Sequence, residues 1–168
     1  LRIHLLAEEN GVSLIPVREA IRMLAADAFV EIVPNRGARV APLSLDDMLD
    51  MYRTRIVLET EALRQGAPRL TPEMLSEARR LIAAFIVARE TQDGRAFEHD
   101  RDFHFLLYQA SESRWMLRLI GILWDHTERY LRLSIPRVTS TSIRVEHGTI
   151  IDLLEAGEFD GAADVLRS

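Results

Sequence analysis

The chain has 168 residues, of which 48% are hydrophobic and 28% are charged, so it is long enough for one ordinary domain or two small ones. It contains no cysteine, which excludes disulfides, thiolate metal ligands and cysteine nucleophiles. The net charge of −5 excludes a protein that is basic throughout and wraps long stretches of DNA, but not a small DNA-binding surface on an acidic body. Neither a secretory signal nor a membrane-length apolar run is present, so we expect a cytoplasmic protein with no membrane partner.

The first nine residues have the apolar periodicity of a helix that starts without methionine, and we interpret the sequence as a fragment. Gly11 ends this helix, because glycine adopts the left-handed conformation at helix ends at little cost. Ser13 is the expected N-cap of a second helix, whose first turn accommodates Pro16. Arg18 and Arg22 lie four residues apart and would share an exposed face of that helix. Two helices joined in this way are typical of a helix-turn-helix, whose second helix enters the major groove of DNA.

A hairpin is expected next, with strands over residues 29–33 and 38–40. A basic hairpin after a helix-turn-helix is a wing, and its tip, Asn35-Arg36-Gly37, would reach the minor groove or nearby phosphates. The spacing alone fits equally well with a helical corner and a hairpin that have no role in nucleic-acid binding.

Residues 41–44 form a short break, and we place a domain boundary there, between an incomplete winged domain (1–43) and a helical domain (44–168). After the break the sequence predicts helices only, separated by short loops. The first of these helices ends near Gln65, and the second begins after Thr71, an N-cap followed by Pro72. The next ends fall near Thr91 and Ala110, before Pro136 and near Ala156; a polar stretch from Thr139 leads into the fifth helix, and the last one begins near Phe159. The expected fold is therefore mainly α, with a partial winged helix-turn-helix followed by an antiparallel, all-helical bundle.

Polar side chains inside this bundle point to a candidate metal site. Asp100 and His104 are four residues apart, so they project from one helix face, and a carboxylate and an imidazole at that spacing can bind one divalent metal. His147 lies among apolar residues in a later helix and needs a partner, which is either the same metal or a hydrogen bond. Tyr108 and Tyr130 fit packing roles, although a tyrosine hydroxyl can also line a pocket.

The segment Gly11–Leu24, GVSLIPVREAIRML, resembles the GVSxxPVREALRxL signature of GntR-family regulators, and residues 30–40 resemble the wing of that family. The resemblance implies that Arg18 contacts DNA from the recognition helix, that Ser13 contacts a phosphate or caps the helix, and that Arg36 and Gly37 lie at the wing tip. It also implies a helix before this segment. Leu14-Ile15 stands where the family often has Arg-Thr.

The remainder resembles the FCD sensor domain of the FadR-type branch of that family, through the motifs at residues 55–59 (RIVLE), 100–104 (DRDFH) and 146–163. The resemblance implies a divalent metal of the Zn, Ni or Mn class bound by Asp100, His104 and His147. A fourth ligand, a histidine, would fall just past Ser168. Arg55 would either pair with the carboxylate of an effector or form an ion pair with Glu59.

These expectations describe a homodimeric transcription regulator that binds operator DNA and responds to a small carboxylate effector. Two alternatives remain open. One is a metal-dependent enzyme that uses Asp100, His104 and His147 to activate water. The other is a metal-free helical dimerisation domain in which these residues form hydrogen bonds.

Overall fold

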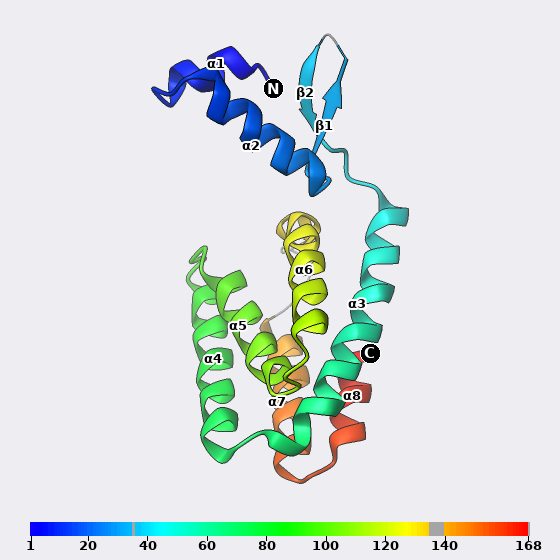
Figure 1. Ribbon diagram of the computed structural model, residues 1–168. Helices are drawn as coiled ribbons and strands as arrows, with labels where there is room; N and C mark the ends of the chain where they lie inside the picture. The colour runs from blue at the N-terminus through cyan, green and yellow to red at the C-terminus, as the bar shows by residue number, and fades with distance from the viewer. Residues whose placement is uncertain (35, 135–139, 168) are drawn as a thin grey trace. The chain divides into compact units, whose positions relative to one another are not determined.

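The computed structural model describes residues 1–34, 36–134 and 140–167, without the side chains of residues 132–143 (Figure 1). These residues form two compact units, Leu1–Ser44 and Leu45–Ser168, which are described separately. The mainly helical fold that the sequence predicts is confirmed. Three features named above lie outside the described residues: Asn35 of the wing tip, Pro136 at the expected end of one helix, and Thr139 before the next.

The N-terminal unit is a helix-turn-helix followed by a two-stranded wing. Its elements are α1 (Ile3–Glu9), α2 (Leu14–Ala26), β1 (Val30–Val33) and β2 (Gly37–Val40), and the two strands are antiparallel, with Val30 opposite Val40. The small core consists of Ile21, Val30 and Ala38, against which Ile3, Leu6 and Val17 pack. The positive φ of Gly37, 85°, and the backbone oxygen of Leu1, which would lie 3.0 Å from an added Cβ, explain the glycine at the start of β2.

The C-terminal unit is a bundle of longer helices. It contains α3 (Leu45–Gly66), a short 3₁₀ helix η1 (Ala67–Arg69), α4 (Pro72–Glu90), α5 (Ala96–Gln109), α6 (Arg114–Ser134), α7 (Ser140–Glu155) and α8 (Phe159–Arg167). Helix α4 begins where the sequence predicts, because Thr71 Oγ1 accepts a hydrogen bond from the Met74 amide at 3.3 Å and Pro72 occupies the first turn.

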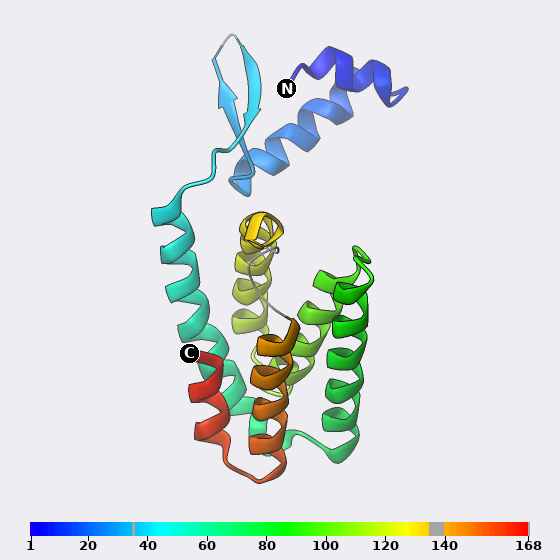
Figure 2. The ribbon, with the colours of Figure 1, turned by 180° about the vertical axis from the view of Figure 1, so that it is seen from behind.

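Helix packing in this unit brings α5 and α7 into one core. Helix α4 packs against both α5 and α7, while α3 packs against α5, α6 and α8. Figure 2 shows α7 between α4 and α8. The fully buried side chains of Leu63, Phe103, Leu107, Ile120 and Ile150 fill the space between the helices. None of the helices in the described part of the chain combines the length and apolar character that a membrane crossing requires.

Candidate metal centre and DNA-binding residues

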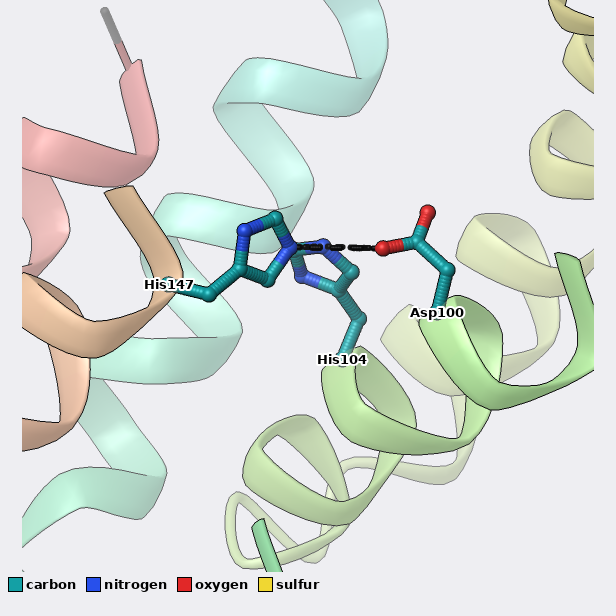
Figure 3. A group of neighbouring side chains, drawn as sticks. All are labelled: Asp100, His104 and His147. Carbon is teal, nitrogen blue, oxygen red and sulfur yellow. Dashed lines mark hydrogen bonds and ion pairs between the residues drawn. The ribbon is translucent and has the colours of Figure 1, made fainter. Parts of the chain in front are cut away.

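Three potential metal ligands converge in the core of the C-terminal unit. Asp100 and His104 lie one turn apart on α5, and His147 faces them from α7 (Figure 3). The Nε2 atoms of the two histidines are 3.1 Å apart. Asp100 Oδ1 lies 3.3 Å from His147 Nε2 and 3.9 Å from His104 Nε2. The fold therefore brings Asp100 and His104, which the sequence places on one helix face, next to His147, which follows His104 by 43 residues.

The donor atoms are spaced as a single metal ion requires. A triangle with sides of 3.1, 3.3 and 3.9 Å has a circumscribed radius of about 2.0 Å, and Zn–N and Zn–O bonds measure about 2.0–2.2 Å. The side chains are shielded from water, with exposed fractions of 18% for Asp100, 10% for His104 and 7% for His147. Two imidazoles and a carboxylate form a donor set that suits first-row divalent metals. The residues present fit such an ion.

Electrostatics keep Asp100 ionised and His104 neutral, which are the protonation states that bind metal. Burial is the main reason why the pKa of His104 falls from 6.5 to about 3, so its imidazole is neutral at physiological pH. For Asp100, burial acts to raise the pKa, but the hydrogen bond from His147 and the nearby His104 and Arg55 outweigh it and lower the pKa overall. A carboxylate and a neutral imidazole thus face each other across the group.

Aromatic rings enclose the two histidines. The ring of Phe85 stacks at 6.4 Å from that of His147, and the ring of Phe103 lies 4.8 Å from it. The Trp124 ring lies 5.3 Å from that of His104. These apolar walls lower the local polarity and fix the orientation of the ligands.

A second polar network, centred on Glu59 of α3, adjoins the candidate metal ligands. The Glu59 carboxylate accepts hydrogen bonds from Arg55 Nε at 2.7 Å, Trp124 Nε1 at 2.8 Å and the Tyr108 hydroxyl at 3.0 Å. Arg55 also donates from Nη1 to Thr127 Oγ1 at 3.0 Å. The sequence analysis did not identify Glu59 as the centre of a network, although a buried tryptophan N–H generally has a partner.

The three candidate effector-binding residues have different surroundings in the structure. Arg55 is 7% exposed and forms the ion pair with Glu59 that was its alternative role. Tyr108 is fully buried, and its hydroxyl lies 3.1 Å from His104 Nδ1. Tyr130 on α6 instead donates to Asp47 Oδ2 at 3.2 Å, near the start of α3.

The candidate DNA-binding residues lie on the N-terminal unit. Ser13 occupies the N-cap position of α2, but its side chain makes no capping hydrogen bond. Arg18 and Arg22 are exposed on α2, where Arg22 pairs with Glu19 at 2.8 Å. Arg36 is exposed next to Gly37 at the turn between β1 and β2. A helix and a hairpin thus both present arginine to solvent, as binding to phosphates and base edges requires.

Comparisons with known proteins agree with this architecture. Residues 1–40 match the family described as bacterial regulatory proteins, gntR family, and residues 50–168 match the FCD domain. The chain is 34% identical over 161 residues to the uncharacterized HTH-type transcriptional regulator BphR of Paraburkholderia xenovorans (strain LB400), covering 90% of this chain and 65% of BphR. It is 25% identical over 178 residues to the HTH-type transcriptional repressor GlaR of Escherichia coli (strain K12), covering 99% of this chain and 80% of GlaR.

Solved structures share the fold. The structure of E. coli McbR/YncC superimposes with a TM-score of 0.81 at 24% identity, covering 99% of this chain and 80% of that one. A GntR family regulator from Pseudomonas syringae pv. tomato str. DC3000 is 33% identical with a TM-score of 0.61, covering 99% of this chain and 71% of that one. The chain spans less than two thirds of some relatives, with 65% of BphR and 55% of the Nta operon transcriptional regulator of Aminobacter aminovorans.

The two family matches cover the sequence except for residues 41–49, and each falls within one compact unit. The chain therefore belongs to the GntR family of bacterial regulatory proteins, in the group whose DNA-binding domain is followed by an FCD domain.

Proposed function

We propose that the chain is a DNA-binding transcription regulator whose helical domain holds a divalent metal and binds a small organic acid next to it. The observation that carries this proposal is the convergence of Asp100, His104 and His147, whose three donor atoms fit one ion. The N-terminal unit supplies the DNA-binding part, with Arg18 and Arg22 on the recognition helix and Ser13, Arg36 and Gly37 as further contacts.

Asp100, His104 and His147 would hold the metal, and the ion would supply a positive charge with open coordination positions for carboxylate oxygens. Zn, Ni and Mn all accept this mixture of nitrogen and oxygen ligands. The aromatic walls formed by Phe85 and Trp124 exclude water around the histidines, which strengthens the attraction between an anion and the site.

A cavity in the C-terminal unit, which shares Phe85 with the surroundings of His147, is large enough for an effector. It has a volume of about 470 Å³ and is lined by Phe85, Arg89, Gln92 and Phe97, among others. Phe85 also stacks on His147, so one residue borders both the cavity and the metal ligands. Pockets of about 300–1,000 Å³ are typical of small-molecule sites. Because Arg55 is already paired with Glu59, an anion bound in this cavity would have the metal and Arg89 as its positive partners.

Regulation requires that the effector bind more tightly to one arrangement of the protein than to another. A symmetric operator presents two half-sites about 34 Å apart, so we propose a homodimer in which two recognition helices read the two half-sites. A regulator of this kind acts on chromosomal DNA and thus in the cytoplasm.

Metal analysis tests this function. The purified chain should contain stoichiometric divalent metal by elemental analysis, and His104→Ala should lose it. His99→Ala is the matched control, because His99 lies on the same helix outside the group of three ligands. The metal-loaded protein should then show an increase in melting temperature with small di- and tricarboxylates, and chelation should abolish this increase.

The alternatives predict other results. A metal-free helical domain would contain no metal in either the wild type or the variants, and organic acids would not change its melting temperature. An enzyme would turn over one of the acids. The matches to regulator families over both units favour regulation over catalysis.

A further inference from the structure

A chain of hydrogen bonds connects the candidate metal ligand His104 to the carboxylate of Glu59 on α3. His104 Nδ1 lies 3.1 Å from the Tyr108 hydroxyl oxygen, and that hydroxyl donates to Glu59 Oε2 at 3.0 Å. All three residues are buried: the exposed fraction of the whole residue, backbone included, is 8% for His104, 0% for Tyr108 and 5% for Glu59. Water therefore does not substitute readily for any of these partners.

The acceptor at the end of the chain sets the direction of every bond in it. Glu59 is ion-paired with Arg55 and, as a carboxylate, can only accept hydrogen bonds. The Tyr108 hydroxyl has one hydrogen, which points to Glu59 Oε2 at 3.0 Å. Once that hydrogen is donated to Glu59, the Tyr108 oxygen can only accept from His104.

The neutral imidazole of His104 then carries its proton on Nδ1, which leaves Nε2 unprotonated. Nε2 is the atom that faces His147 Nε2 at 3.1 Å and Asp100 Oδ1 at 3.9 Å. The surroundings of His147 agree with this assignment, because a proton on His147 Nε2 can be shared between Asp100 Oδ1 at 3.3 Å and His104 Nε2. The lone pair of His104 thus points into the ligand group before any ion arrives.

We propose that Tyr108 is a positioning residue that, anchored by Glu59, fixes the tautomer of His104 in which Nε2 is free to bind a metal. This inference rests on the proposed metal site and adds to it a specific role for two residues that do not touch the ion. Removing a side chain that hydrogen-bonds to a metal ligand, without itself touching the metal, typically weakens metal binding by about 10–100-fold.

The first test measures the tautomer of His104 directly in the wild-type chain and needs no metal. Long-range ¹H–¹⁵N correlation spectra of the metal-free wild-type chain at neutral pH distinguish a protonated from an unprotonated imidazole nitrogen. His104→Gln identifies the signals of His104. We expect the proton on Nδ1 and an unprotonated Nε2; a proton on Nε2 would overturn the proposal.

The second test measures Zn²⁺ affinity by competition with a chromophoric chelator. Tyr108→Phe removes only the hydroxyl and should weaken Zn²⁺ binding by about 10–100-fold, with a mixture of His104 tautomers in the metal-free spectrum. Thr127→Val is the matched control, since it removes a buried hydroxyl that contacts Arg55 but not His104. Its Zn²⁺ affinity should lie within about threefold of that of the wild type, because no hydrogen-bond partner of a metal ligand is lost.

The two tests separate failure of the inference from failure of the proposed function. If wild type binds no Zn²⁺ but His104 carries its proton on Nδ1, the metal site fails while the assigned direction of the hydrogen-bond chain stands. If Tyr108→Phe folds, binds Zn²⁺ as the wild type does and keeps the same tautomer, Tyr108 has no positioning role. Equal losses in Tyr108→Phe and Thr127→Val would also refute it, since they indicate general destabilisation.

Discussion

Glu59→Ala should destabilise the C-terminal unit strongly. The Glu59 side chain is 7% exposed and that of Arg55 is 8% exposed, so both charges of the ion pair are shielded from water. Removing the carboxylate leaves the Arg55 cation buried without its anionic partner. The N–H of Trp124 and the hydroxyl of Tyr108 also lose their acceptor.

The size of the expected loss of stability follows from the burial of this ion pair. Breaking a buried ion pair by removing one partner costs about 3–5 kcal/mol, because an uncompensated charge remains in a medium of low polarity. Glu61→Ala is the matched control: Glu61 lies on the same helix, is exposed and accepts a hydrogen bond from Gln65 at 2.7 Å. A surface change of this kind typically alters stability by about 0.5 kcal/mol or less.

Urea unfolding measures the difference. Both tryptophans of the chain, Trp115 and Trp124, lie on α6, so their fluorescence reports on the C-terminal unit alone. The double variant Arg55→Met/Glu59→Leu should be more stable than Glu59→Ala, since it leaves no unpaired charge in the core.

A free energy of unfolding that falls no further for Glu59→Ala than for Glu61→Ala would refute the reasoning. It would mean that water or a rearranged side chain compensates the Arg55 cation, and that the ion pair contributes little to the stability of the bundle.

Three further predictions concern other parts of the chain. In the full-length protein, Arg18→Ala should weaken the free energy of operator binding by about 1–3 kcal/mol without changing the circular dichroism spectrum. Unchanged affinity in a gel-shift titration would exclude α2 as the recognition helix. Gly37→Ala should lower the stability of the N-terminal unit by about 1–2 kcal/mol, because φ at this position is 85°, and thermal denaturation followed by circular dichroism checks this. Hydrogen bonds from the side chain and backbone of Arg95 lower the pKa of Asp93 from 3.8 to about 2, so its contribution to stability is present above pH 3.8 and is lost as the pH falls towards 2. A carboxyl NMR titration should show this midpoint, and Arg95→Ala should raise it towards 3.8; a wild-type midpoint near 3.8 would contradict the assigned contacts.

Local signals in the sequence were sufficient for the architecture. The positions of Ser13, Thr71 and Gly11 predicted where helices begin and end, and the structure places helix boundaries at all three. Turn residues and helix caps act within a few residues of the chain, so their effect can be read without knowing the fold. The short η1 helix after α3 was not predicted, because a single 3₁₀ turn has no distinctive periodicity.

The candidate site was only partly accessible to such reasoning. The spacing of Asp100 and His104 fixes their common helix face, but it does not say what that face meets. The association with His147 came from a resemblance to a family, and the fold brings the two histidines to 3.1 Å. The choice between two roles for Arg55 was left open, and the structure contains the ion pair with Glu59.

The sequence by itself therefore determined the order of the helices and hairpin, the family, and the helix face that carries two of the candidate metal ligands. Only the tertiary structure revealed that Glu59 accepts from Trp124, 65 residues away, and from Tyr108, 49 residues away. Nothing local in the sequence encodes these partners. They arise because α3, α5 and α6 pack together and exclude water, so that each buried donor must find an acceptor on a neighbouring helix.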